Sequence, residues 1–332
     1  MDKFKHFVGI DISKSSFDVA VLTPSNLEAK IHQVFPNSVK GIKKFIKWIN
    51  NEGLAIDNTL FCLEQTGIYS ELLSSLLEDQ KAKVWIIMPY AMKHSMGLQR
   101  GKTDKLDSFR IAEYGFRHED KVVLEKPSNQ GIKTLKKMLT AREQLLDSIS
   151  RLEVYLAELK QFDLDSYKII KPSYTSSINS LKKNLKKLEE EIDKVCLENE
   201  EIRKTLSLGC SIVGVGKITM LHIMVATKMF TKCVNAKQLA CYCGVAPFAF
   251  SSGKSINKKP RVHFMANKKI KSLLHMCAIS SIRHDQEINA YYTRKIEEGK
   301  HALVCINNVK RKLLERIFVV IKRQTPYMKV AA

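Results

Sequence analysis

Four carboxylates occupy positions from which they could act together on a phosphate. Asp11 interrupts one apolar stretch near the N-terminus, and Glu64 ends a second apolar stretch. Asp104 and Asp107 lie three residues apart in the sequence KTDKLD, a spacing that puts both on one face of a helix. Such acids would repel one another if no cation lay between them. Mg²⁺ or Mn²⁺ would relieve this repulsion, and two such ions can bind both oxygens of a phosphoryl transfer.

Each acid also has an ordinary explanation when it is taken alone. An aspartate beside a strand end often forms a turn or a cap, and acids in the first turn of a helix favour the helix dipole. The metal hypothesis therefore depends on the four acids meeting in the folded chain.

A second candidate chemistry lies in a lysine-rich segment, SSGKSINKKPRVHF, where Ser251 and Ser252 precede Gly253. A serine hydroxyl is a weak nucleophile near neutral pH and requires activation. By itself this sequence is typical of a flexible loop, and it does not distinguish Ser251 from Ser252 as a nucleophile.

The charge of the chain points to a polyanionic partner. The 332 residues include 55 Lys and Arg against 34 Asp and Glu, a net charge of +21, and residues 251–332 carry 18 basic and only 5 acidic residues. Nucleic acid is the commonest such partner, and an acidic membrane surface is the alternative. The basic residues expected to bind nucleic acid are Lys102, Lys105, Arg110, Lys254, Lys258, Lys259, Arg261, Lys268, Lys269 and Lys271.

The first domain, residues 1–127, is expected to be an α/β domain that positions the acids. Alternating apolar residues predict strands at 6–12, 17–22, 29–35, 59–64 and 83–89 and helices at 38–51, 70–77 and from about 104, in the order βββαβαβα. In such a sheet the first strand is central and the fourth can pair with it, so Asp11 and Glu64 would converge. A late helix would add Asp104 and Asp107.

The remainder is expected to be mainly helical. Residues 130–160 and 175–206 predict two long helices joined near Pro172, as an antiparallel hairpin or coiled coil or as a core-packing pair, within a linker at 128–206. Residues 207–332 predict a basic helical domain. In its sequence SIVGVGKITM, Gly214 and Gly216 are similar to the turn of a helix-hairpin-helix, although an ordinary glycine turn is at least as probable.

The acid positions resemble an RNase H-like fold of the RuvC-like group. More narrowly, GIDISKSSFDVAV, CLEQTGIY and KTDKLDSFRIAEY resemble the signature blocks of DEDD insertion-sequence transposases of the IS110 type. SIVGVGKITM, LACYCGVAPFAFSSGKS and the block that begins ANKKIKSLLHMC resemble the C-terminal transposase domain of that family. The resemblance covers nearly the whole chain, with the blocks in the family's order.

The resemblance implies a DNA transposase or recombinase that acts on an insertion sequence. Asp11, Glu64, Asp104 and Asp107 match the acids that hold Mg²⁺, and Ser252, with Ser251 as the alternate, matches the nucleophilic serine that forms a transient phosphoserine link. The family also implies a structured guide RNA encoded by the element. Because the acids and the serine lie in different predicted domains, they would have to meet across an interface, and a homo-oligomer formed through the long helices is one hypothesis for it.

Other functions are left open at this stage. A RuvC-like metal-dependent nuclease or resolvase without a covalent step uses the same acids, and a non-catalytic nucleic-acid-binding protein would need only the basic surface. An actin-like sugar kinase is disfavoured because Ile12, Ser13 and Lys14, with no glycine, follow Asp11. The chain has no apolar run of about 20 residues and no secretion signal, so a cytoplasmic prokaryotic protein with reduced cysteines is expected.

Overall fold

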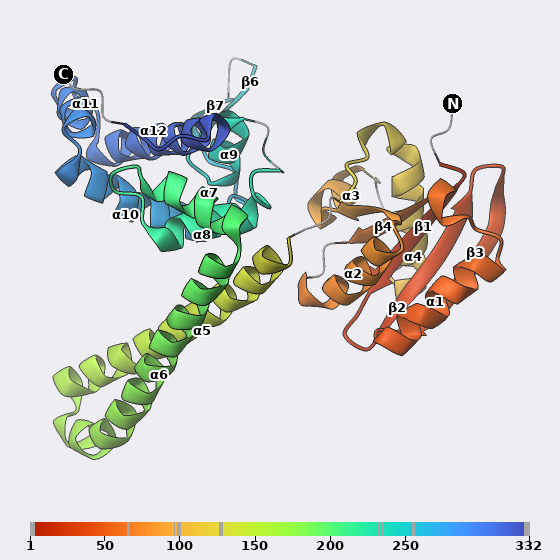
Figure 1. Cartoon of the computed structure of the whole chain (residues 1–332), viewed down its shortest axis with the longest axis horizontal. Coiled ribbons are helices and arrows are strands. Elements are labelled where there is room, and N and C mark those ends of the chain that lie inside the picture. The colour runs from red at the N-terminus through yellow and green to blue at the C-terminus, as the bar shows by residue number, and fades with distance from the viewer. Residues whose placement is uncertain are drawn as a thin grey trace. The chain divides into compact units, whose positions relative to one another are not determined.

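The computed structural model describes residues 4–64, 67–95, 97, 101–125, 129–231, 233, 235–253 and 256–328, with backbone alone at 26–30, 252 and 256–259. The chain divides into two compact units, Met1–Pro127 and Ser128–Ala332. Their elements are drawn in Figure 1. Among the described residues, no helix is long and apolar enough to cross a membrane.

The first unit is built on a five-stranded mixed sheet with the strand order β3-β2-β1-β4-β5. Its strands are β1 (His6–Ile12), β2 (Ser16–Thr23), β3 (Asn26–Pro36), β4 (Thr59–Glu64) and β5 (Lys83–Ile87). The hairpins pair β1 with β2 and β2 with β3 in antiparallel register, whereas β4 runs parallel to both β1 and β5. The predicted strands and the central place of β1 are therefore confirmed.

Helices cover the two faces of this sheet. They are α1 (Val39–Asn51), α2 (Glu71–Asp79), α3 (Pro89–Ser95) and α4 (Asp104–Arg117), with short 3-10 turns at η1 (Ile56–Asn58), η2 (Gly67–Ser70) and η3 (Glu119–Lys121). Alternate residues of β1 face opposite sides: Val8 and Ile10 pack in one core with residues of α1 and α2, and Phe7 packs in another with residues of α4. The helix α3 was not predicted; Pro89 ends the strand as expected, but proline is also well suited to open a helix.

Gly9 explains how closely α4 lies on the sheet. A Cβ atom built on Gly9 would lie 2.1 Å from the backbone oxygen of Ser108 and 2.3 Å from the backbone nitrogen of Ala112. A Cβ on Gly115 would likewise meet Sγ of Cys62, at 2.4 Å, and the ring of Phe7. Helix α4 therefore runs antiparallel to β1 in direct backbone contact, and its N-terminal end lies toward Asp11.

The second unit begins with two long helices that lie side by side, α5 (Gln130–Phe162) and α6 (Leu164–Glu198) (Figure 1). The predicted connection at Pro172 is wrong, because Pro172 lies inside α6. The chain reverses at Asp163, whose carboxylate accepts a hydrogen bond from the backbone N–H of Ser166 at 3.0 Å and so caps α6. Pro172 is exposed, so the carbonyl that it leaves without a helical partner can be hydrated.

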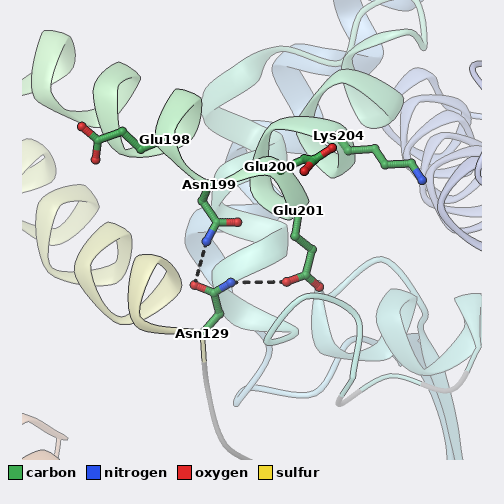
Figure 2. Close-up of a pocket in the computed structure, with 6 residues that line it drawn as sticks. All are labelled: Asn129, Glu198, Asn199, Glu200, Glu201 and Lys204. Carbon is green, nitrogen blue, oxygen red and sulfur yellow. Dashed lines mark hydrogen bonds between the residues drawn. The ribbon is translucent and has the colours of Figure 1, made fainter.

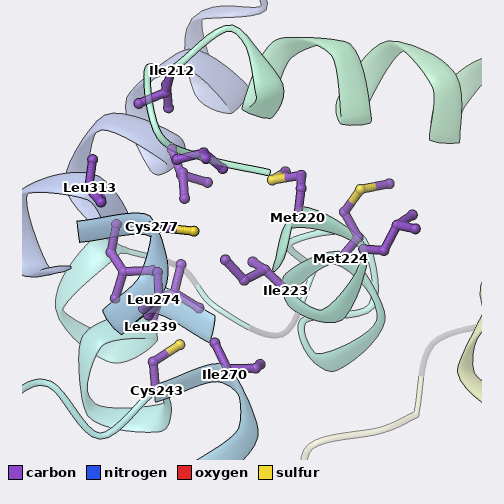
Figure 3. Packing of buried hydrophobic residues seen from close by; sticks show 14 of the residues in the cluster. Ile212, Met220, Ile223, Met224, Leu239, Cys243, Ile270, Leu274, Cys277 and Leu313 are labelled. Carbon is purple, nitrogen blue, oxygen red and sulfur yellow. The ribbon is translucent and has the colours of Figure 1, made fainter. Parts of the chain in front are cut away.

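The rest of the unit is mainly helical, as predicted. Its elements are α7 (Glu200–Cys210), α8 (Lys217–Ala226), α9 (Ala236–Tyr242), β6 (Phe248–Ser252), β7 (Ile256–Arg261), α10 (Lys268–His284), α11 (Gln286–Glu297) and α12 (Ala302–Arg323). Their core, part of which is drawn in Figure 3, includes Met220, Leu239, Leu274 and Leu313. The antiparallel pair β6 and β7 is the main departure from the sequence analysis, which placed a loop there.

The turn before α8 is a packing turn. Gly214 has a φ of +89°, and a Cβ built on it would lie 2.1 Å from Oγ of Ser281 in α10. The Ser281 hydroxyl donates to the Val213 carbonyl at 2.7 Å, which fixes the turn against α10. These contacts account for Gly214, and a phosphate-binding role for this turn stays a prediction.

The eight cysteines are all free thiols, which agrees with the expected reduced state. Cys243, two residues after Cys241, is buried, and burial raises its thiol pKa to about 12. It packs in the core of the second unit, so its role is that of a small apolar side chain.

Candidate active site

The acidic site lies at the end of β1 and β4 on the side covered by α4. Burial, followed in order of effect by the nearby charges of Asp104, Glu64, Asp107 and Asp18, raises the pKa of Asp11 to about 6. Burial and the charge of Asp107 also raise the pKa of Glu64, whereas Lys102 lowers it. The four acids named from the sequence therefore lie close enough in the folded unit for their charges to interact.

The start of α4 is stabilised by a helix cap and by an arginine that contacts both Asp107 and the preceding turn. Thr103 is the N-cap, and its hydroxyl accepts from the backbone N–H of Leu106 at 3.2 Å. One guanidinium nitrogen of Arg110 donates to Asp107 at 2.7 Å, and the other donates to the carbonyl of Gly101 at 2.9 Å. Arg110, expected from the sequence to bind nucleic acid, is thus engaged in positioning Asp107 and the turn before it.

A fifth acid was missed from the sequence. Asp18 is the cross-strand partner of Asp11 in the β1–β2 register, so the two residues lie on one face of the sheet. Asp18 also pairs with Nε2 of His32 at 2.8 Å, and the His32 ring lies 6.3 Å from the ring of Phe109 in α4. Alternation along β2 could have placed Asp18 on the same face of the sheet as Asp11, but not directly opposite it.

The donor set suits a hard divalent cation, because every predicted ligand is a carboxylate. The pKa values of Asp11 and Glu64 are raised first by burial and then by neighbouring carboxylates, which Lys102 and Arg110 compensate only in part. Even so, no group of three or more acidic, histidine or cysteine side chains in the described part of the chain stands close enough to hold an ion. The acids lie within electrostatic reach, and their side chains would have to turn inward to share one cation.

The predicted serine lies on the β6–β7 ribbon in the second unit. Ser251 pairs with Asn257 and Ser252 with Ile256, and Gly253 continues the turn with a φ of +56°. Ser251 is exposed. The side chains of Ser252, Lys258 and Lys259 and the whole of Lys254 lie outside the described residues, so these predictions remain as they were made.

The other basic residues named from the sequence differ in their surroundings. Lys102, Lys105, Arg261 and Lys268 are exposed, and Lys271 is half-buried. Lys269 is engaged within the unit, because its ammonium group lies 3.1 Å from Glu143 of α5. Lys269 therefore ties α10 to α5 in this structure.

None of these residues lines the polar pocket of the second unit, which lies where α5 begins and α6 meets α7. Figure 2 shows its lining residues, which are Asn129, Glu198, Asn199, Glu200, Glu201 and Lys204. The amide of Asn199 donates to Asn129 at 3.2 Å, and Asn129 donates to Glu201 at 3.3 Å. Asn129 and Asn199 also cap α5 and α7, so helix capping accounts for this cluster.

A mixed α/β unit with an acidic cluster, joined to a basic helical unit, defines a class of enzymes that act on nucleic acid phosphates. Comparison with known proteins agrees: residues 8–161 match the family model of the DEDD transposases of the IS110 type, and residues 207–293 match that of the transposase IS116/IS110/IS902 family. The chain belongs to the IS110 family of transposases and is a DNA transposase or recombinase. The family also indicates a requirement for a divalent metal and a DNA substrate.

Its relatives extend this similarity over the whole chain. It is 28% identical over 331 residues to the pilin gene-inverting proteins of Moraxella bovis and Moraxella lacunata, covering 98% of this chain and 98% of each relative. It is also 28% identical over 161 residues to an uncharacterized 43.6 kDa protein of the insertion element IS110 from Streptomyces coelicolor, covering 48% of this chain and 38% of that one.

Proposed function

We propose that this transposase cuts and rejoins DNA strands through a Mg²⁺-bound acidic tetrad and a serine nucleophile. The observation that carries the proposal is the backbone contact of α4 with β1 at Gly9. This contact directs the start of α4, with Asp104 and Asp107, toward the end of β1 that carries Asp11. The parallel strand β4 ends at Glu64 beside it.

The frame of the first unit is an RNase H-like one of the RuvC-like group. A sheet in the order β3-β2-β1-β4-β5, with an antiparallel half and a parallel half, supports this assignment. So does an acid on the central strand, with a second acid at the end of its parallel neighbour. We assign Asp11, Glu64, Asp104 and Asp107 as the metal ligands.

When bound, Mg²⁺ would supply positive charge for the developing charge on phosphorus and would orient the oxygens of the phosphate. The residues of the chain divide the remaining work. The four carboxylates hold the metal, and Arg110 orients Asp107. Lys102 and Lys105, which are exposed around the start of α4, bind the DNA backbone.

Ser252, or Ser251 as the alternate, attacks the phosphorus of a DNA strand. The serine oxygen forms a new bond to phosphorus as it gives up its proton, the bond from phosphorus to one deoxyribose oxygen breaks, and that oxygen takes up a proton. A deoxyribose hydroxyl of the exchanged strand then displaces the serine. One phosphodiester replaces another at each exchange, so the reaction requires no ATP.

We also propose a structured RNA from the element as a guide and an oligomer formed through the long helices α5 and α6. The net charge of +21 supports a polyanionic partner. Exposed apolar side chains on the long helices, Phe162 and Ile169 among them, support an interface there. The gene-inverting relatives support inversion of a DNA segment as one outcome of the recombination.

The decisive experiment is a search for a protein–DNA adduct. Purified protein is incubated with Mg²⁺, RNA from the flanks of its own element and labelled DNA carrying the joined element ends, then separated on a denaturing gel. We expect an adduct with the wild-type chain and with Ser251→Ala, and none with Ser252→Ala.

The adjacent serine is the matched control, because both variants change the same ribbon by one hydroxyl. An adduct lost only in Ser251→Ala would move the nucleophile by one residue. Metal-dependent cleavage without an adduct in any of these proteins would overturn the covalent step and favour a RuvC-like nuclease. Binding without cleavage would favour the non-catalytic alternative.

A further inference from the structure

The ribbon that carries the serines also exposes aromatic side chains. Phe248 is 50% exposed and Phe250 is 57% exposed; they are alternate residues of β6, and the register with β7 shifts between them. Phe264, three residues after β7 ends, is 66% exposed. Phenylalanine is usually buried, so an exposed pair on a two-stranded ribbon calls for a binding role.

Basic residues lie opposite these rings in the ribbon. In the β6–β7 register Phe248 pairs with Arg261 and Phe250 pairs with Lys258. Each aromatic position therefore has a cationic neighbour across the strand. Nucleotides present the complementary pair of groups, because a base can stack on an aromatic ring while its phosphate binds a cation.

We propose that Phe248 and Phe250 form a stacking platform for unpaired bases of a nucleic acid strand. The inference rests on the proposed function for its location, because it identifies what holds the strand beside the serine nucleophile. At about 3.3 Å per residue, Ser252 lies about 7 Å along β6 from Phe250. A base stacked on Phe250 would fix the position of the phosphate nearest to Ser252.

Unpaired bases suit this surface better than a duplex or a protein. The bases of a duplex are stacked on one another, so their faces are available only where the strands are opened or the base is extruded. A second copy of this chain would bring a like-charged surface to the ribbon, since residues 251–332 carry 18 basic and 5 acidic residues. Opening of strands is also what a strand exchange requires.

The test compares stacking with mere apolar contact. The double variants Phe248→Leu/Phe250→Leu and Phe248→Trp/Phe250→Trp are made in the full chain, with Tyr90→Leu as the control, because Tyr90 is an aromatic residue of α3 that is 37% exposed. Fluorescence anisotropy measures binding to oligothymidylate, oligouridylate, an abasic strand of the same length and a duplex.

We expect the leucine pair to weaken binding to both base-containing single strands by about tenfold or more, the effect typical of losing base stacking. The tryptophan pair and the Tyr90→Leu control should bind as the wild type does. Binding to the abasic strand and to the duplex should change little. Loss with oligothymidylate alone would assign the platform to DNA, and loss with oligouridylate alone to the RNA.

Two results would overturn the proposal. One is equal binding of all the variants to the base-containing strands. The other is a loss that is as large with the abasic strand, because this would reflect damage to the ribbon or to its charge. Wild-type strand affinity does not depend on adduct formation, so failure of the covalent mechanism and failure of the stacking platform are separately visible.

Discussion

The acidic site and the serine ribbon are built in opposite ways. Asp11 lies on the central strand of a sheet that is covered on both faces, and α4 is locked onto that strand at Gly9. The serine ribbon is a two-stranded hairpin with exposed phenylalanines and a left-handed glycine at its turn. Packing positions the backbone that carries the acids before any substrate binds, whereas the ribbon depends on its partner strand and on what it binds. We therefore expect substitutions in the two regions to fail for different reasons.

The largest expected effect comes from neutralising the acids. Asp11→Asn or Glu64→Gln should lower strand cleavage at least about a thousandfold, because a neutral amide cannot replace a carboxylate that holds the metal. Asp57→Asn is the matched control, since Asp57 is an exposed acid elsewhere in the same unit. Gel-based cleavage rates at saturating Mg²⁺ measure the effect, and a variant that retains more than about a tenth of the rate would remove its residue from the site.

Glycine substitutions test the structural half of the comparison. Gly9→Ala should destabilise the first unit by about 3 kcal/mol or more, because its Cβ would meet backbone atoms of α4 at 2.1 and 2.3 Å. Gly253→Ala should cost only about 1 kcal/mol, because only its left-handed φ of +56° opposes a side chain and no described atom lies within 4 Å of the added Cβ. Thermal unfolding of both variants gives the difference, and equal losses would contradict it.

A smaller effect is expected at the start of α4. Arg110→Ala should destabilise the metal-free chain by about 2 kcal/mol, because the largely buried carboxylate of Asp107 would lose its ion pair beside other acids. Arg117→Ala, which removes an exposed pair with Glu113 from the same helix, should cost less than about 0.5 kcal/mol. If the two variants unfold at the same temperature, Arg110 has no positioning role.

The same contrast separates what the sequence predicts from what it hides. The strands that carry Asp11 and Glu64 could be predicted because their apolar residues alternate or are continuous, and α4 because Thr103 opens it with acids in its first turn. The pairing of Asp18 with Asp11 depends on the register between two strands, which no local pattern specifies.

The β6–β7 ribbon was missed for a related physical reason. Its second strand, INKKPR, is largely polar and basic and so lacks the alternation of a half-buried strand, and only cross-strand backbone bonds define the pair. At Pro172 the error was the opposite one: the sequence predicted a break, but the helix continues. An exposed helix tolerates a proline when the freed carbonyl faces water.

The smallest expected effect is a dependence of stability on pH that originates at Asp11. Its pKa of about 6 in the folded unit lies above the ordinary value of 3.8, so the folded state binds an extra proton between these values. The free energy of unfolding of the metal-free chain should therefore fall as the pH rises from about 4 to about 6 and stay lower above it.

Asp11→Asn removes this penalty and should stabilise the metal-free chain by about 1 kcal/mol at about pH 7.5 and by less at about pH 4.5, a value reduced because Asp11 is only half-buried. Mg²⁺ should reverse the order, because it binds the wild-type carboxylates and not the amide. Thermal unfolding of both proteins at the two pH values, with EDTA or with Mg²⁺, measures the effects of pH, of the substitution and of the metal on stability. If Mg²⁺ does not stabilise the wild-type chain above pH 6, metal binding at Asp11 is contradicted. The comparison of the two metal-free proteins would still test the repulsion between the acids.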